Sequence, residues 1–585
     1  MRRRRSARVL TSPDDLRWYQ DAIIYQLHVK TFFDSNGDGV GDFEGLIRKL
    51  DYVRELGATC VWLLPFYLSP LFDDGYDVAH YEQVHPIYGS LADVRRFVSE
   101  AHARGLRVIT ELVVNHTSDQ HPWFQASRRA PAGSAKRDVY VWSDDNQKFA
   151  DARIIFGDSE ASNWTWDHEA GAYYWHRFFH HQPDLNFDSP LVRRAVSKIM
   201  RFWFDIGVDG LRLDAVAHLY EREGTSCDNL PETHAFLRTL RADLDVHYPG
   251  RVLLAEVNQT PDVTRAYFGI GDECQMVFHF PLMPRLFQAL ALARASPVLD
   301  ALEATMDLPP GCQWAVFLRN HDELTLSALP AEDREALLEL YAPSPFMRLH
   351  QGVRRRLAPL LGNDRRRIEM AHALLLSLPG SPVLYYGDEI GMGDNLALPD
   401  RDGVRTPMQW SAEPHGGFTN PGASVSAAPP IDDDTHGFRV VNVAAQERDR
   451  GSLLSRVRHL IRVRRSDPVF GRGRTTLLRC ANPSVLALLR HDDRHQVLVL
   501  ANLSGEPQSV RVPLPGIGQH EGVHGGLELF DLIGGHSRRV AAGAEAWALE
   551  PYDYRWCLIE PAAAGTAPDR AAGEGQVPSA VPVAG

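Results

Sequence analysis

Eight short apolar runs recur along the chain, and they restrict its fold more than any other feature. They occupy residues 23–29, 60–65, 106–114, 210–216, 251–257, 275–280, 313–321 and 381–387. Each run is nearly continuous in hydrophobic residues rather than alternating, as a strand covered on both faces requires. Amphipathic helical stretches lie between most of them, for example at residues 91–104. An α/β alternation repeated eight times predicts a closed (β/α)8 barrel, or TIM barrel.

The connection after the third run is too long for an ordinary loop. Residues 115–191, rich in Trp, His, Asp and Pro, are expected to form an inserted excursion domain (domain B) over the barrel mouth. The catalytic barrel is then assigned to residues 18–114 and 192–465. From about residue 475, short alternating runs separated by Gly, Pro and Asn predict an antiparallel β-sandwich, and we place this C-terminal β domain at 466–561. Residues 1–17 and 562–585 are expected to be a disordered arm and a disordered tail.

Composition excludes several classes of partner. The formal net charge is −13, which argues against nucleic acid and anionic membrane surfaces. No run of 18 apolar residues is present, and no apolar segment of a signal peptide follows the arginines near the N-terminus. Six scattered cysteines form no CxxC pair, so neither structural zinc nor a disulfide framework is indicated. We therefore expect reduced thiols and a cytoplasmic protein.

Carboxylates stand where three of the predicted strands end. Asp214 lies in the fourth run, Glu256 in the fifth, and Asp322 directly after the seventh. The carboxyl ends of all strands in a (β/α)8 barrel converge on one pocket. One such carboxylate could merely cap a strand in solvent, whereas three favour an active site. Imidazole and guanidinium groups flank them at His116, Arg212 and His321.

These three carboxylates suit glycoside chemistry. One carboxylate attacks the anomeric carbon while a second, kept protonated by its surroundings, protonates the leaving oxygen. Arg212 stands two residues before Asp214, so both side chains point to the same side of a strand. A positive charge there favours the ionised form of Asp214. Asp322 could hydrogen-bond sugar hydroxyls in the transition state.

At these motifs the chain resembles the α-amylase superfamily of glycoside hydrolases and transferases. The four motif regions of that superfamily appear in order at residues 111–116, 210–215, 253–257 and 317–322. Within it, residues 18 to at least 418 resemble the trehalose synthases, or maltose α-D-glucosyltransferases. The stretches that carry this resemblance are residues 116–124, 151–156, 221–225, 229–234, 280–284, 319–325 and 401–410.

The resemblance implies a role for each site residue. Asp214 is the implied nucleophile, Glu256 the acid/base and Asp322 the transition-state stabiliser. The residues expected to bind the glucosyl unit are Asp73 and Tyr76 at its non-reducing end, Asp77 beneath the site, His116, Arg212, His321, and one of Arg401 and Arg405. The residues expected to close the pocket as a gate are Arg153, Asn258 and Glu323.

The chain departs from the family pattern at several positions. Glu111 stands where an Asp is usual, so the local support of the neighbouring Asn115 and His116 is expected to differ. Three further departures affect fine substrate preference rather than chemistry: Ala217, Val257 and Thr260.

Two structural cation sites are also expected. Oxygen donors alternate in an acidic turn that fits Ca2+, and the missing Glu at position 45 excludes an EF-hand. The resemblance implies that this turn binds Ca2+ or Mg2+ through Asp34, Asn36, Asp38, Asp42 and the carbonyl of Val40. It implies a second Ca2+ held by Asn115, Asp184, Glu221 and the carbonyls of His218 and Leu219. The alternatives are an acidic turn without metal and an ordinary hydrogen-bond network. No organic cofactor is implied.

Three functions remain open at this point. The first is an isomerase that interconverts maltose and trehalose by a retaining double displacement with some hydrolysis, and it is favoured by the gate residues. The second is a hydrolytic α-glucosidase or α-amylase with the same carboxylates. The third is a catalytically dead binding barrel, like the amylase-like subunits of membrane transporters, which the intact carboxylates disfavour. A homo-oligomer is expected, and a maltokinase is a candidate partner.

Overall fold

A computed structural model describes residues 16–425, 428–513, 526–540 and 544–561. These residues divide into two compact units, one within residues 1–473 and the other from residue 474 onward. The predicted tail (562–585) and all but the last two residues of the predicted N-terminal arm lie outside the described residues.

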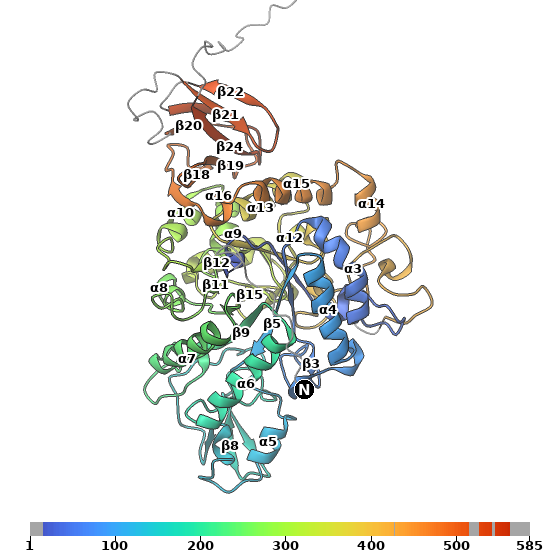
Figure 1. Cartoon of the computed structure of the whole chain (residues 1–585), viewed down its shortest axis with the longest axis vertical. Coiled ribbons are helices and arrows are strands. Elements are labelled where there is room, and N and C mark those ends of the chain that lie inside the picture. Colours follow the sequence, from blue (N-terminus) through green and yellow to red (C-terminus); the bar gives the residue numbers. More distant parts are fainter. Residues whose placement is uncertain (1–15, 426–427, 514–525, 541–543, 562–585) are drawn as a thin grey trace, which may run out of the picture. The chain divides into compact units, whose positions relative to one another are not determined.

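The first unit contains a closed barrel of eight parallel strands (Figure 1). Its strand order is β1-β16-β12-β11-β10-β9-β5-β2. All eight predicted runs contribute a strand, and the strand interiors are buried. The strands are β1 (Ile24–Leu27), β2 (Cys60–Leu63), β5 (Arg107–Val113), β9 (Gly210–Asp214), β10 (Val252–Ala255), β11 (Met276–Phe278), β12 (Gln313–Phe317) and β16 (Ser381–Tyr385).

Helices follow the strands, and local sequence sets where they begin and end. The predicted helix at 91–104 is confirmed as α4 (Leu91–Ala103), whose first turn is closed by a capping box of Ser90 and Asp93. Helix α6 (Pro190–Ile206) begins with a proline, and the residue that follows its last turn is Gly207, whose φ of 118° favours glycine. The other helices that follow barrel strands are α2 (Val29–Phe32), α3 (Phe43–Leu56), α7 (Pro231–His247), α8 (Pro261–Ala266), α9 (Met283–Leu292), α10 (Ser296–Glu303), α13 (Arg365–Ser377) and α15 (Leu453–Ser466).

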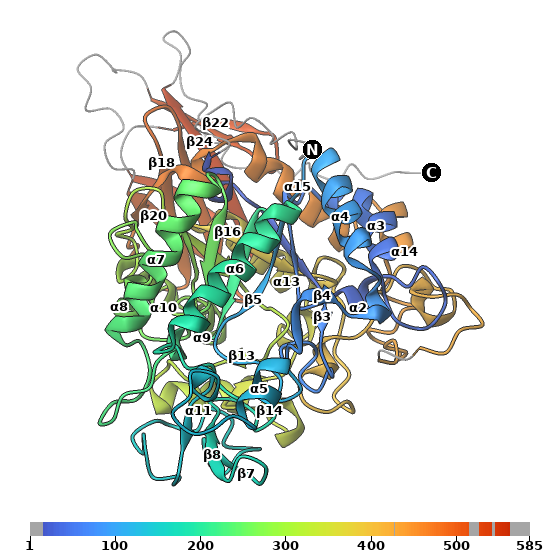
Figure 2. The same ribbon diagram turned by 60° about the horizontal axis from the view of Figure 1, so that its bottom comes forward.

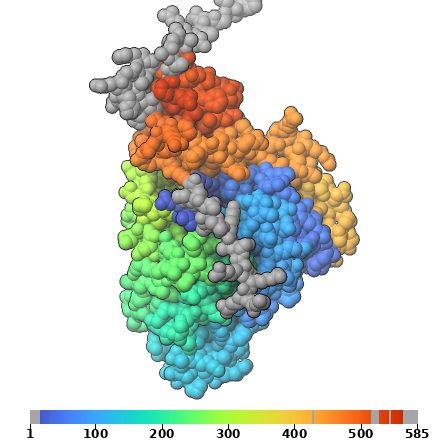
Figure 3. All heavy atoms as spheres, in the orientation of Figure 1, coloured from blue at the N-terminus to red at the C-terminus, as the bar shows by residue number. Residues whose placement is uncertain are grey.

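Four connections, rather than the single one expected, carry secondary structure of their own. The predicted insertion after β5 holds α5 (Pro122–Ser127) and a small sheet of β6 (Trp142–Ser143), β8 (Ala172–Trp175) and β7 (Trp164–Asp167). Figure 3 shows this segment, in light blue to cyan, as a lobe at one end of the first unit. The connection after β12 contains β13 (Leu324–Thr325), α11 (Ala331–Tyr341), β14 (Arg348–Leu349), β15 (Gly352–Val353) and α12 (Leu357–Leu360). The connection after β16 contains α14 (Val443–Arg448), and the loop after β2 contains β3 (Tyr67–Leu68) and β4 (His80–Val84).

The second unit is antiparallel, as expected. A six-stranded sheet has the order β17-β18-β19-β24-β21-β22, and β20 pairs with β23. The strands are β17 (Arg474–Leu477), β18 (Val485–His491), β19 (Gln496–Asn502), β20 (Gln508–Pro513), β21 (Leu527–Asp531), β22 (Ser537–Val540), β23 (Ala544–Leu549) and β24 (Tyr554–Pro561). The division between the units falls at residues 473/474, eight residues after the expected boundary, because α16 (Val469–Arg472) belongs to the first unit.

No helix in the described part of the chain is long and apolar enough to cross a membrane.

Candidate active site

A cavity of about 180 Å3 lies at the carboxyl ends of the barrel strands. All three carboxylates that the sequence singles out line it. The other lining residues that the sequence predicts are Asp73, Tyr76, His116, Arg153, His218, Asn258, His321, Glu323, Arg401 and Arg405. The carboxyl-end cluster expected from a barrel is therefore present.

Arg212 connects the carboxylates beneath this cavity. Its Nη1 donates to Asp214 Oδ1 (2.6 Å) and to Glu111 Oε2 (2.9 Å), and its Nη2 lies 2.5 Å from Glu256 Oε1. Strand register explains the Glu111 contact, because Glu111 of β5 is paired directly with Arg212 of β9 and their side chains share a face. The predicted Arg212–Asp214 contact is present, and one guanidinium contacts both Asp214 and Glu256.

One positive charge cannot keep three buried carboxylates ionised. Burial raises the pKa of Asp214 to about 7; Arg212 opposes this rise, and the negative charge of Glu111 adds to it. Burial likewise raises the pKa of Glu256 to about 7, again opposed by Arg212 and reinforced by Asp214. Burial also raises the pKa of Glu111 to about 7. The cluster therefore holds a proton near neutral pH, as a site with a general acid needs.

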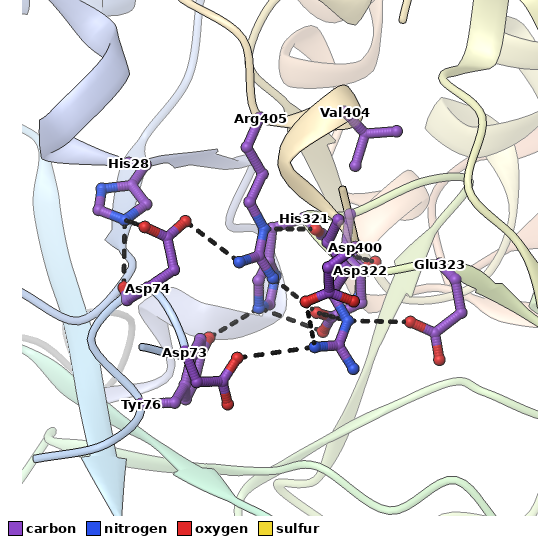
Figure 4. Close-up of polar contacts among 12 residues, drawn as sticks. His28, Asp73, Asp74, Tyr76, His321, Asp322, Glu323, Asp400, Val404 and Arg405 are labelled. Atoms are coloured by element: carbon purple, nitrogen blue, oxygen red, sulfur yellow. Dashed lines mark hydrogen bonds and ion pairs between the residues drawn. The ribbon is translucent and has the colours of Figure 1, made fainter. Parts of the chain in front are cut away.

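Asp322 lies in a more cationic environment (Figure 4). Arg405 Nη2 donates to Asp322 Oδ1 at 3.0 Å, and Arg401 Nε lies 3.3 Å from the same oxygen. Burial raises the pKa of Asp322, but the interaction with the neighbouring His321 ring (Nε2 to Oδ2, 3.1 Å) and the charges of Arg401 and Arg405 outweigh burial and lower the pKa below its ordinary value. Asp322 is therefore ionised, which suits a group that stabilises positive charge.

Two arginines face the cavity, but they differ in the bonds they already make. Arg405 also donates to Asp74 Oδ2 (3.1 Å) and to the carbonyl of His321 (2.9 Å), so each of its nitrogens has an acceptor (Figure 4). Arg401 pairs with Glu323 (3.1 Å) and lies 3.6 Å from Asp73 Oδ1. Both side chains remain candidates for the contact with sugar.

His321 and Tyr76 form a rigid wall. Their rings stack with centroids 5.5 Å apart, and His321 Nε2 lies 2.7 Å from the Tyr76 hydroxyl. The amide of Gln26, on β1, lies 2.7 Å from His321 Nδ1. Burial lowers the pKa of His321 well below its ordinary value, so the ring is neutral and Nε2 can carry the hydrogen while Nδ1 accepts from Gln26.

Two of the expected binding residues lie in the connection between β3 and β4. Asp73 lines the cavity and accepts a hydrogen bond from Gln182 Nε2 (2.8 Å). Asp77 is completely buried and accepts from Ser69 Oγ and from the backbone N–H of Phe72 and Asp73. Asp77 thus supports the loop that presents Asp73, in agreement with its predicted place beneath the site.

The three predicted gate residues come from three separate connections, and all of them line the cavity. Glu323 is held by Arg401. Asn258 Nδ2 donates to Thr325 Oγ1 (3.0 Å) and to Ser327 Oγ (3.2 Å). Arg153 has an exposed side chain and makes no ion pair within 4 Å among the described residues. The geometry brings the three together but does not itself test a gating role.

Several lining residues were not singled out from the sequence. The aromatic ones are Phe156, Phe178 and Phe280, and the others are Ile155, Ala215, Gln259, Asn320 and Thr325. Phe156 and Phe280 end or begin two of the stretches that carry the family resemblance, which is the signal that could have found them. Glu111 is also part of the site, and it contacts Trp62, Tyr76 and Arg212. Of the other departures, Ala217 lines the cavity.

Three buried oxygens near the cavity have no hydrogen-bond partner among the residues that the structure describes. They are Asn115 Oδ1, Asp184 Oδ2 and Glu221 Oε1. Burial raises the pKa of Asp184 to about 8, and burial followed by the charge of Asp184 raises the pKa of Glu221 well above its ordinary value. A set of buried, unpaired oxygen donors is what a hard cation such as Ca2+ requires. The side chain of His218 binds Asp228 instead, which leaves its carbonyl as the predicted donor.

In the acidic turn of residues 34–42, by contrast, the carboxylate oxygens already have hydrogen-bond partners. Its carboxylates accept hydrogen bonds within the turn: Asp34 from the N–H of Gly37 (2.7 Å) and Gly39 (2.8 Å), and Asp42 from Gly45 (2.7 Å). Asn36 and Asp38 bond to each other. The turn is therefore satisfied without an ion, so the residues fit a cation here less strongly than at Asp184.

Comparison with known proteins agrees with this geometry. Residues 26–473 match the family model for the α-amylase catalytic domain, and residues 475–556 match that for the maltogenic amylase C-terminal domain.

Two curated relatives and one solved structure cover most of the chain. It is 53% identical to "Trehalose synthase" of Thermus thermophilus over 86% of its own length, and it spans about half (52%) of that relative. It is 51% identical to "Trehalose synthase/amylase TreS" of Mycolicibacterium smegmatis, covering 86% of the chain and 87% of the relative. The structure of the α-glucosyl transfer enzyme XgtA superimposes with a TM-score of 0.75 at 30% identity, covering 93% of this chain and 99% of the other.

Proposed function

This chain belongs to the α-amylase family, and on that premise we propose that it interconverts maltose and trehalose by intramolecular glucosyl transfer. The observation that carries this proposal is the pairing of Asp214 and Glu256 on one guanidinium within a closely lined cavity. Such a site can form a glycosyl-enzyme and then exclude bulk water.

The chemistry proceeds in two displacements at one carbon. Glu256 protonates the oxygen between the two glucose units while Asp214 attacks the anomeric carbon and forms a β-glucosyl ester. The freed glucose turns within the cavity and attacks with its anomeric hydroxyl, which Glu256 deprotonates. Two inversions retain the α configuration. Asp322, held ionised by Arg401 and Arg405, stabilises the oxocarbenium-like charge in both steps.

Retention of the acceptor distinguishes this reaction from hydrolysis. Asn258, Glu323 and Arg153 line the cavity from three separate connections, and Glu323 is fastened to Arg401. If these side chains hold glucose in place and limit access of water, transfer wins over hydrolysis. If water enters freely, the same carboxylates make a plain α-glucosidase.

The experiment that tests the proposal is the product analysis of purified protein given maltose alone. We expect trehalose as the main product, with free glucose as a minor one. Arg153→Ala should increase glucose relative to trehalose without abolishing the covalent step. If the unaltered protein forms mainly glucose from the earliest time points, the protein is a hydrolase and not an isomerase.

We further propose that Asn115, Asp184 and Glu221 bind a structural Ca2+, supported by their three unpaired oxygens. The ion would supply positive charge that these buried oxygens lack and would fix Asn115, the neighbour of His116. A weaker proposal of the same kind concerns Asp34–Asp42, where Mg2+ is an alternative. Homo-oligomerisation, a maltokinase partner and a cytoplasmic location stay predictions.

A further inference from the structure

A strained hairpin stands at the tip of the connection after β12. Strands β14 and β15 are joined by only His350 and Gln351, and both have positive φ (46° and 65°). A two-residue turn of this type favours Asn-Gly, because Cβ crowds the backbone in the left-handed region, glycine has no Cβ, and Asn tolerates this conformation better than most residues. Strain of this kind in non-glycine residues persists where surrounding contacts impose it, and it often marks a functional position.

The hairpin tip contacts the inserted domain. The His350 ring stacks on Phe156, with centroids 4.2 Å apart and planes at 19°. The His350 N–H donates to Asp158 Oδ2 at 3.0 Å. Figure 2 shows β14 on the same side of the first unit as the strands of the inserted domain. The loop that carries the gate residue Arg153 is thus fastened to a connection almost two hundred residues away in sequence.

Phe156 carries this contact to the cavity. Its ring is 7% exposed and lines the cavity, and the guanidinium carbon of Arg401 lies 5.1 Å from the ring centroid. His350 does not line the cavity; it packs against the ring that does.

The hairpin is equally fixed on its other side. β15 pairs with β13, which begins two residues after Asp322. A Cβ on Gly352 would lie 2.6 Å from the carbonyl oxygen of Leu324 and 2.8 Å from Cγ of Glu323, so the backbones are in close contact there. Movement of the hairpin would therefore move Glu323, and movement of Phe156 would be resisted by the hairpin.

We propose that the hairpin tip formed by His350 and Gln351 is a latch that holds residues 153–158 of the inserted domain against the cavity, and that this latch decides whether freed glucose is retained or replaced by water. This inference rests on the proposed glucosyl transfer and adds to it a positioning residue, His350, that touches no substrate. The stacking of the His350 ring on Phe156 makes the contact, and the left-handed backbone of the turn orients the His350 ring toward Phe156.

Two substitutions at one position separate the ring from the backbone. His350→Asn removes the ring but suits the left-handed backbone, so the fold is preserved. His350→Phe keeps an aromatic ring on Phe156. Phe346→Ala is the matched control, since Phe346 is an aromatic residue of the same connection that is 72% exposed.

The first measurement is the ratio of glucose to trehalose formed from maltose. We expect His350→Asn to raise this ratio by roughly threefold to tenfold, the range for loss of one aromatic pair. His350→Phe and Phe346→Ala should stay near the unaltered ratio. The rate of glucosyl-enzyme formation from an activated aryl α-glucoside should change little in all three.

The second measurement is amide hydrogen exchange of residues 153–158 in the full chain, which does not depend on the reaction. Exchange should accelerate in His350→Asn alone. An unchanged product ratio in His350→Asn, while the unaltered protein makes trehalose, overturns the latch. If the unaltered protein makes only glucose, the proposed function fails, and the latch then stands or falls on the exchange result.

Discussion

In the proposed reaction, Asp214 and Glu256 have different tasks although Arg212 contacts them both. Asp214 would have to be ionised to attack, and Glu256 would have to carry a proton to release the leaving sugar. Their pKa values are both raised to about 7, so the pair shares its proton near neutral pH and titrates as a unit.

Replacement of each carboxylate tests its role. Asp214→Ala should lower kcat/KM for maltose by about 10⁴-fold or more, the scale of losing a nucleophile. Glu256→Gln should cost about 10²- to 10⁴-fold, and less with a substrate whose leaving group needs no proton. Steady-state kinetics on both substrates checks this, with circular dichroism confirming the fold. Equal losses on both substrates in Glu256→Gln would contradict its role as acid.

The pH profile follows from the same pair. Activity should fall at low pH as Asp214 becomes protonated and at high pH as Glu256 loses its proton, which gives a bell centred near pH 7. Glu111→Gln removes a negative charge that raises the pKa of Asp214. The acidic limb of kcat/KM should therefore move to lower pH.

Glu44→Gln is the control for this shift, because it removes an equal charge from the surface of α3, where Glu44 pairs with Arg48 and Arg96. Its profile should match that of the unaltered protein. If the acidic limb of kcat/KM in Glu111→Gln keeps its position or moves to higher pH, Glu111 does not raise the pKa of Asp214.

Among the secondary-structure elements, the connections rather than the strands supply most of the side chains that line the cavity. The strands position Arg212 and Asp214 through register, which any parallel barrel could do. The connection after β5 supplies Arg153 and Phe156, that after β12 supplies Asp322 and Glu323, and that after β16 supplies the two arginines.

Cation binding should stabilise the junction of the inserted domain with the barrel. An ion that binds only the folded state adds about 2.7 kcal/mol at a hundredfold excess over its Kd. Exhaustive chelation should therefore lower the Tm, and added Ca2+ should restore it, as followed by scanning calorimetry.

Two isosteric variants assign this effect to one site. Asp184→Asn should abolish most of the response to Ca2+, whereas Asp38→Asn in the acidic turn should preserve it. A response that is lost in Asp38→Asn and kept in Asp184→Asn would place the ion at the other site. If neither chelation nor added Ca2+ changes the Tm, the metal proposal is wrong.

The sequence was sufficient to predict the barrel because strands covered on both faces are continuously apolar. It also predicted the carboxylates, which follow those strands directly. It could not define the connection after β12, since β13, β14 and β15 are two residues long and leave no periodic signal. It also missed Phe156, because an aromatic residue in a loop has the same composition signal whether it packs in a core or lines a cavity.

At the scale of the molecule, the first unit combines a rigid barrel with a cavity wall assembled from distant segments. Residues 153–158, 322–325 and 401–405 meet there through ion pairs of Arg401 with Asp322 and Glu323 and through the contact of Arg401 with the Phe156 ring. Such a wall can enclose a sugar during a reaction that the barrel carboxylates alone would also permit with water. Enclosure of the acceptor is therefore what distinguishes the proposed glucosyl transfer from hydrolysis.

An isotope experiment tests this enclosure most directly. Maltose labelled with 13C only in its reducing-end glucose is incubated with the protein and a large excess of unlabelled glucose, and the trehalose formed is analysed by mass spectrometry at early times. If the acceptor stays in the cavity, nearly every trehalose molecule carries the label despite the excess. Unlabelled trehalose in proportion to the added glucose would show that the acceptor leaves the cavity, and the absence of trehalose would show that the protein does not catalyse this transfer.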